Sequence, residues 1–84
     1  MSTNIYVGNL TFNTNNADLE ALFAPHGEVT RATVITDRDT GRSRGFGFVE
    51  MGTADSAAAA IEALNGQSVD GRDLTVNVAK ERSR

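Results

Sequence analysis

The segment from Arg44 to Met51 constrains the fold of this chain more than any other part of its sequence. Its residues, Arg-Gly-Phe-Gly-Phe-Val-Glu-Met, predict a β-strand, along which side chains point alternately to the two faces of a sheet. One face of that strand then carries Arg44, Phe46, Phe48 and Glu50. The opposite face carries Val49 and Met51 together with two glycines. Two phenylalanines therefore lie on the charged face rather than the aliphatic face, which indicates a surface that binds a flat, charged ligand.

A second segment, Ile5 to Leu10, predicts a strand of the same kind, because it is rich in β-branched and aromatic residues. Alternation places Tyr6 on the face opposite to Ile5. If the two strands are neighbours, Tyr6 joins Phe46 and Phe48 in one exposed cluster. Single-stranded nucleic acid fits such a cluster, since each base offers a face for stacking and each phosphate offers a charge to an arginine.

The two segments resemble the paired motifs of the RNA recognition motif family. Residues 44–51 follow its eight-residue ribonucleoprotein motif, basic-Gly-aromatic-Gly-Phe-Val-x-aromatic, at every position except the last. Residues 5–10 follow its six-residue partner motif. Met51 stands where the family usually has Phe or Tyr, and alternation puts it on the core face, where methionine can fill the space of a ring. A narrower resemblance is to the small single-domain RNA-binding proteins of bacteria, notably cyanobacteria.

Capping residues and apolar spacing predict two helices. Asn15 is placed to cap the first, with Asp18 three residues further on, and this helix stops before Pro25. Thr53 is placed to cap the second, which ends at Asn65 and Gly66. The apolar stripe of the second helix consists of Ala57, Ala60, Ile61 and Leu64. Each helix therefore has one face to bury.

Two further strands complete a β-α-β-β-α-β order. The segment Val29 to Thr36 is β-branched and is expected to turn Ala32 and Val34 inward, with Arg31 and Thr33 outward. The last strand is entered through the turn at residues 69–72. Its aliphatic face is expected to consist of Leu74, Val76 and Val78.

Two helices with one apolar stripe each, and strands with one aliphatic face each, predict an α+β two-layer sandwich with both helices on one face of the sheet. The family resemblance implies a ferredoxin-like fold, a four-stranded antiparallel sheet in the order 4-1-3-2 with the two motif strands as central neighbours. We expect the domain to span residues 3–80, followed by a short basic disordered tail at residues 81–84.

Charge and composition restrict the possible partners. The sequence has 8 lysine and arginine residues against 11 acidic residues, a net charge of −3, whereas nucleic-acid-binding domains are usually basic. Residues 38–44 and residues 80–84 nevertheless each contain three basic residues and one acid, so phosphate should be attracted locally. Cysteine is absent and the longest apolar run, residues 57–61, is too short to span a membrane. We therefore expect a cytoplasmic protein with no membrane partner.

The resemblance implies that Tyr6, Phe46 and Phe48 stack bases and that Arg44 is the main contact to a phosphate or base. Further candidate RNA contacts are Arg31, Thr33, Arg38, Arg42, Asn77 and Lys80. Asn4 is a candidate at the edge of the first strand, and Gly8 is expected to serve backbone geometry. His26 is expected to be turn surface.

We therefore expect a monomeric domain that binds short single-stranded RNA, about two to four nucleotides, with stacking of about 1–3 kcal/mol per base. No reaction, cofactor, metal site or small-molecule substrate is implied. Single-stranded DNA remains open as a second ligand, and the resemblance to small bacterial proteins suggests an RNA chaperone or post-transcriptional regulator. The alternative is a protein-interaction module that uses the same face. Small acyl-phosphate hydrolases share the element order, but nothing in this sequence supplies a phosphate cradle.

Overall fold

The structure is a computed structural model that describes residues 3–69 and 71–79. In chain order its elements are β1 (Asn4–Gly8), α1 (Asn16–Phe23), the 3-10 turn η1 (Ala24–His26), β2 (Val29–Thr36), β3 (Ser43–Met51), α2 (Ala54–Leu64), β4 (Ser68–Val69), β5 (Arg72–Asp73) and β6 (Thr75–Val78). The predicted β-α-β-β-α-β order is confirmed, with the short strands β4 and β5 added before the last long strand. None of the helices in the described ranges is long and apolar enough to cross a membrane.

Within the described residues, the strands β2, β3, β1 and β6 form one antiparallel sheet in that order. This order confirms that the two motif strands, β1 and β3, are central neighbours. Their register pairs Tyr6 with Phe48 and Gly8 with Phe46. The strands β4 and β5 pair separately as a small hairpin, at the place where the sequence predicted only a turn.

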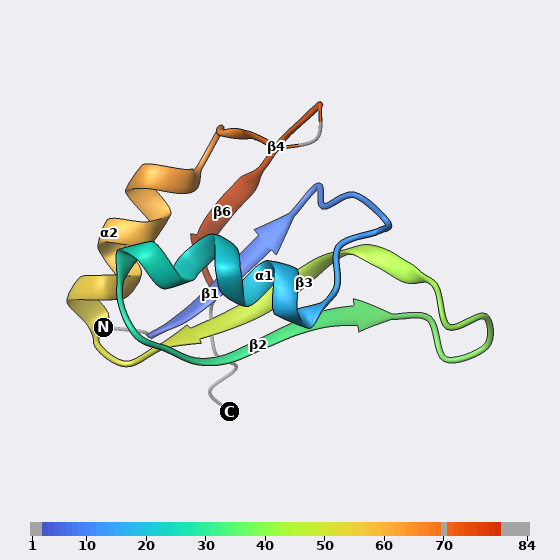
Figure 1. The fold of residues 1–84 in the computed structure, drawn as a ribbon, viewed down its shortest axis with the longest axis horizontal. Coiled ribbons are helices and arrows are strands. Elements are labelled where there is room, and N and C mark those ends of the chain that lie inside the picture. The colour runs from blue at the N-terminus through green and yellow to red at the C-terminus, as the bar shows by residue number, and fades with distance from the viewer. Residues whose placement is uncertain (1–2, 70, 80–84) are drawn as a thin grey trace.

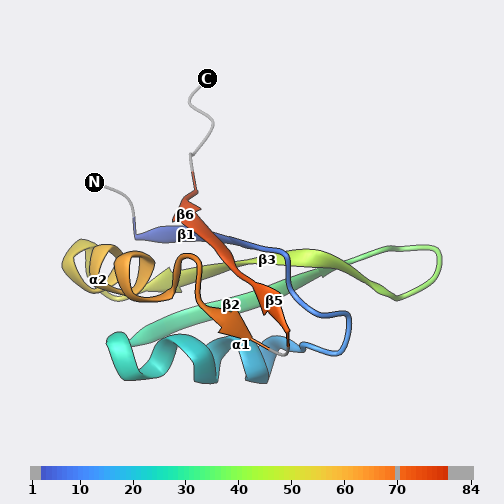
Figure 2. The ribbon, with the colours of Figure 1, turned by 90° about the horizontal axis from the view of Figure 1, so that it is seen from above.

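The sheet and the helices form two layers (Figure 1). Figure 2 shows α1 running along one side of the sheet. One core cluster joins the buried residues of both helices and of the strands, which places α2 on the same side as α1. The cluster consists of Ile5, Val7, Leu10, Leu19, Phe23, Val34, Val49, Met51, Ala57, Ala60, Leu64, Leu74 and Val76. The predicted ferredoxin-like α+β sandwich is therefore confirmed.

Most residues predicted to point into the core do so. Met51 is 1% exposed, which confirms that it takes a core position where the family usually has a ring. Val34 is buried and Ala32 is half-buried against the core cluster. Val78 was expected to belong to the buried face of the last strand, and this expectation was wrong, because it is 51% exposed. It is the last residue of an edge strand, which has a neighbouring strand on one side only.

Both helices begin at the capping residues that the sequence predicted. The Asp18 backbone N–H donates to Asn15 Oδ1 over 2.8 Å, and the Asn15 backbone N–H donates to Asp18 Oδ2 over 3.2 Å. These reciprocal bonds form a capping box, which satisfies two backbone donors at the start of α1. In α2, Thr53 Oγ1 accepts a hydrogen bond of 3.1 Å from the Ser56 backbone N–H. The side chain of the capping residue thus fixes the start of each helix.

Two asparagines link the helices to the strands. Asn16, the first residue of α1, accepts through Oδ1 a 2.7 Å hydrogen bond from the Val34 backbone N–H in β2. Asn65, which caps the end of α2, accepts through Oδ1 a 3.1 Å hydrogen bond from the Val76 backbone N–H in β6. The helices are therefore held to the sheet by polar contacts as well as by the apolar core.

Candidate nucleic-acid interface

Three aromatic side chains meet on the sheet, as predicted. Tyr6 lies 5.9 Å from Phe46 and 5.9 Å from Phe48 between ring centroids, and Phe46 lies 6.0 Å from Phe48. The angles between the ring planes are 34°, 63° and 90° respectively. Distances and tilts of this kind are typical of attractive aromatic pairs. The rings therefore form one contiguous cluster across β1 and β3.

The rings lie on the face of the sheet that points away from the core. They alternate along their strands with Ile5, Val7 and Val49, all of which are buried in the core cluster. Phe48 is 39% exposed, and Tyr6 and Phe46 are half-buried. We call this side of the sheet, defined by Tyr6, Phe46 and Phe48, the ring face. It offers partly exposed aromatic surface to solvent.

The strand register places four of the predicted polar contacts beside these rings. One row across the sheet runs through Thr33, Phe48, Tyr6 and Asn77. The next row runs through Arg31, Glu50 and Asn4. A shallow cavity of about 280 Å³ beside Phe48 is lined by Asn4, Arg31, Thr33, Ile35, Phe48, Val49 and Glu50. The ring face thus carries both hydrogen-bonding and charged groups next to its aromatic surface.

Arg44 is exposed in β3, but its orientation does not follow from simple alternation. The next residue, Gly45, has a φ of +84°, in the left-handed region that favours glycine. Opposite this point the register between β2 and β3 shifts, between Val34 and Thr36. The regular alternation of side chains along β3 is therefore interrupted at Gly45, so alternation does not place Arg44 on the same face as Phe46.

Arg38 and Arg42 lie exposed in the loop that connects β2 and β3 and extends beyond the sheet (Figure 1). The Asp37 backbone N–H donates to the Arg42 carbonyl over 2.7 Å, and the Gly41 backbone N–H donates to the Asp37 carbonyl over 2.8 Å. These bonds fix the loop as a tight turn. Within the described part of the chain, none of the side chains of Arg31, Arg38, Arg42 and Arg44 forms an ion pair. Lys80 lies outside the described residues.

Gly8 lies against the ring of Tyr6. A Cβ atom at Gly8 would lie 2.6 Å from the Tyr6 hydroxyl and 2.9 Å from Tyr6 Cε2. The tyrosine ring therefore lies directly over this glycine, two residues along the same strand. Gly8 was expected to serve backbone geometry, but the structure shows that it makes space for an aromatic side chain of the ring face.

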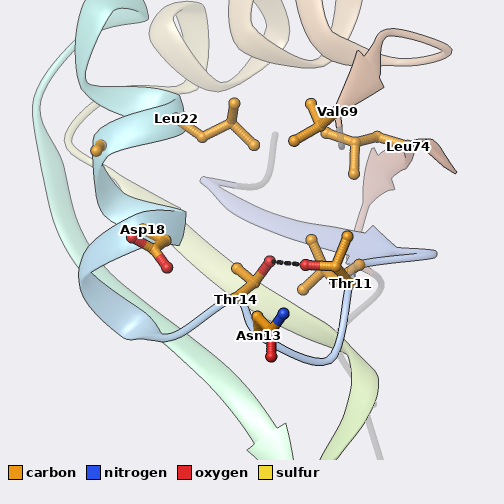
Figure 3. A pocket seen from close by; sticks show the side chains of 9 residues that line it. Thr11, Asn13, Thr14, Asp18, Leu22, Val69 and Leu74 are labelled. Atoms are coloured by element: carbon orange, nitrogen blue, oxygen red, sulfur yellow. Dashed lines mark hydrogen bonds between the residues drawn. The ribbon is translucent and has the colours of Figure 1, made fainter. Parts of the chain in front are cut away.

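A separate cavity of about 310 Å³ lies between α1 and the β4–β5 hairpin (Figure 3). Leu22, Val69 and Leu74 form its apolar wall, and Thr11 and Thr14 are joined there by a 2.9 Å hydrogen bond between their hydroxyls. No predicted site residue lines it. Residues 3–69 and 71–79 also contain no cluster of three or more acidic or histidine side chains that would hold a metal ion.

A sequence profile described as the RNA recognition motif matches residues 5–75. The chain belongs to the RNA recognition motif family. This membership agrees with the position of the ring face on the two motif strands and with the element order described above.

Individual relatives and structures support the same assignment. The protein RbpA of the cyanobacterium Synechocystis is 56% identical over 78 residues, which cover 93% of this chain and 77% of RbpA. A crystal structure of RNA binding protein PG1 has a TM-score of 0.92 and 54% identity, and covers 99% of this chain and 100% of that one. The Rna15 RNA recognition motif, solved with bound RNA (GU), has a TM-score of 0.87 and 27% identity, and covers 96% of this chain and 86% of that one.

Some relatives of this RNA recognition motif are much longer proteins. The chain spans 26% to 36% of the length of the chloroplast RNA-binding proteins and ribonucleoproteins that it matches in Arabidopsis, spinach and Nicotiana. In those proteins the matched region is one part of a larger chain.

Proposed function

We propose that the ring face binds short single-stranded RNA, with bases stacked on Tyr6, Phe46 and Phe48. The observation that carries this proposal is the contiguous cluster of three partly exposed rings, with centroids 5.9–6.0 Å apart, on the side of the sheet away from the helices. Neighbouring bases of one RNA strand can each stack on a ring of such a cluster. The bound RNA in the Rna15 structure, which has the same fold, supports this use of the domain.

The polar groups around the rings complete the proposed interface. We assign Thr33 and Asn77 to contacts with base edges or sugars, because they share a row of the sheet with Phe48 and Tyr6. Arg31 lies one row away. The exposed arginines Arg38, Arg42 and Arg44 are assigned to phosphates, since they are free of ion pairs in the described part of the chain. Together these groups would accommodate about two to four nucleotides.

We propose that this domain acts in the cytoplasm and that it is a monomer. RNA chaperone activity or post-transcriptional regulation is the role that its resemblance to small bacterial RNA-binding proteins favours. Deletion of the gene should then change the structure or turnover of RNA under cold or other stress, as measured by chemical probing and decay rates. Unchanged RNA structure and turnover would contradict this role.

Salt dependence is expected to separate RNA binding from peptide docking. RNA binding that neutralises Z phosphates weakens with a log-log slope of about −0.7Z, because it releases counterions from the strand. Arg44→Gln should therefore reduce the slope by about 0.7 if Arg44 contacts a phosphate. The slope is measured by fluorescence anisotropy with a labelled, randomised RNA pool between about 50 and about 200 mM salt. A flat response together with tight binding of a protein ligand would favour the protein-interaction module instead.

Gly8→Ala is expected to weaken RNA binding about fivefold with little effect on folding. The added methyl group would push the Tyr6 ring out of its position, and the ring is at the end of a side chain that can rotate away. Stacking on that ring, about 1–3 kcal/mol per base, would be partly lost. RNA affinity is measured by anisotropy and stability by urea unfolding.

A double-mutant cycle provides the control for Gly8. In a Tyr6→Ala background, Gly8→Ala should have no further effect on affinity, because the ring that it displaces is absent. Additive losses of affinity would show that Gly8 acts on RNA binding independently of Tyr6.

A further inference from the structure

Phe12 is an exposed aromatic residue outside the ring face. It is 66% exposed and lies in the loop between β1 and α1. A phenylalanine that leaves most of its surface in water contributes little to the core, and its surroundings decide whether it is a contact. We infer that Phe12, together with Arg72, forms an additional stacking position for one more nucleotide of the RNA strand that occupies the ring face. The inference rests on the proposed function and extends it.

Phe12 lies beside β3 at Gly45, the residue that precedes Phe46. A Cβ atom on Gly45 would be 3.5 Å from Phe12 Cε1, so the Phe12 ring packs beside Gly45, the residue immediately before Phe46. The loop is held there by a 2.8 Å hydrogen bond from the Leu10 backbone N–H to the Gly45 carbonyl. A strand of RNA that passes over Phe48 and Phe46 can therefore continue toward Phe12.

Arg72 fixes the position of this ring and brings a positive charge to it. The guanidinium carbon of Arg72 lies 5.4 Å from the centroid of the Phe12 ring, a cation–π distance. Arg72 Nη1 also donates to Asn9 Oδ1 over 3.3 Å, and Asn9 Nδ2 donates to the Asp73 carbonyl over 2.7 Å. The β1–α1 loop is thus tied to β5. The remaining guanidinium N–H groups are available to a phosphate.

A cavity beside Phe12 supplies the space for the nucleotide. Its volume is about 380 Å³, and it is lined by Phe12, Gly41, Arg42 and Ser43. This volume is within the range of small-molecule sites, about 300–1,000 Å³. Two arginines, Arg42 on its wall and Arg72 over the ring, therefore flank an exposed aromatic surface. This combination fits a nucleotide, which carries a flat base and a negative phosphate.

A purely structural role for Phe12 is the competing explanation. The contact with Arg72 would then serve only to hold the loop against β5, and RNA would not touch the ring. The two explanations predict different affinities for RNA of different lengths. If Phe12 stacks the last nucleotide of the RNA, its loss weakens the binding of a longer RNA and leaves the binding of a shorter RNA unchanged.

The first test compares wild type and Phe12→Ala with RNA oligonucleotides of about three and about six nucleotides. We expect Phe12→Ala to bind the longer RNA about five- to tenfold more weakly than wild type and the shorter RNA equally well. Val78→Ala is the matched control, because Val78 is also an exposed apolar residue but pairs with Ile5 on the helix side of the sheet. It should bind both oligonucleotides as wild type does.

The second test uses fluorescence. The sequence contains no tryptophan, so Phe12→Trp introduces a single tryptophan at the proposed position, whose emission can be excited selectively over that of Tyr6. A base stacked on that ring should quench its emission at least about twofold when the longer RNA is added. In Val78→Trp, the added RNA should leave the emission unchanged. This readout responds to contact with a base and does not depend on affinity alone.

The outcomes separate this inference from the proposed function. If Phe12→Ala binds RNA of both lengths as wild type does, or if Phe12→Trp is not quenched, the additional position is overturned while the ring face stands. If wild type binds neither oligonucleotide, or if Phe46→Ala/Phe48→Ala binds both as wild type does, the proposed function is overturned, and the additional position is overturned with it.

Discussion

The Phe46→Ala/Phe48→Ala variant is expected to remain folded and to bind single-stranded RNA at least about 30-fold more weakly than wild type. Each ring is expected to contribute about 1–3 kcal/mol through base stacking, and the variant removes two of them. Both side chains lie on the ring face, outside the buried core cluster, so their truncation leaves no cavity under the helices. Fluorescence anisotropy measures the affinity, and circular dichroism with urea unfolding verifies the fold.

The control for this variant keeps an aromatic ring at both positions and adds only a hydroxyl group to each. Phe46→Tyr/Phe48→Tyr retains two aromatic faces and should bind RNA within about threefold of wild type, because stacking depends on the ring. If the folded alanine variant binds RNA as tightly as wild type, the three rings are not the RNA platform. The protein-interaction module would then become the preferred function of the ring face.

Gly47→Ala is expected to destabilise the domain by about 2–3 kcal/mol without changing the RNA affinity of the molecules that remain folded. Gly47 belongs to the ribonucleoprotein motif but lies on the core side of β3. A Cβ atom there would be 2.5 Å from the Thr33 carbonyl oxygen and 3.1 Å from both Leu19 Cδ2 and Val34 Cα. Two of these atoms belong to the backbone of β2, which cannot move without disturbing the sheet.

Urea unfolding measures the loss of stability, and anisotropy at low temperature measures affinity in the folded population. Gly52→Ala serves as the matched control, because the nearest atom to its added Cβ would be Glu28 Oε1 at 3.3 Å, on a side chain that can move. We expect that control to change stability by less than about 1 kcal/mol. A Gly47→Ala variant as stable as Gly52→Ala would show that the sheet adjusts without strain.

Local signals in the sequence were sufficient to predict the helices, and alternation together with the family resemblance predicted the ring cluster. The capping box at Asn15 and Asp18 depends on residues three positions apart, so the sequence contains all of it. The cluster of Tyr6, Phe46 and Phe48 followed from alternation once the family resemblance made β1 and β3 neighbours. The capping box depends on short-range interactions. The ring cluster depends on a pairing of strands that the family resemblance implies.

Features that depend on loop conformation could not be predicted in the same way. The left-handed conformation of Gly45 and the register shift opposite it interrupt the alternation on which the placement of Arg44 depended. Phe12 and Arg72 come together through a contact across 60 positions of the sequence. An aromatic residue in an otherwise polar loop was the available signal for Phe12, but the sequence does not show which residue it contacts. The exposure of Val78 likewise depends on its place at the end of an edge strand.

The two asparagines that link helices to strands also protect the borders of the sheet. β2 and β6 are its outer strands, and an outer strand presents unpaired N–H groups to which a strand of another molecule can add. Asn16 occupies the Val34 N–H of β2, and Asn65 occupies the Val76 N–H of β6. One donor on each border is therefore already used within the molecule. This arrangement opposes growth of the sheet by addition of a strand from another copy.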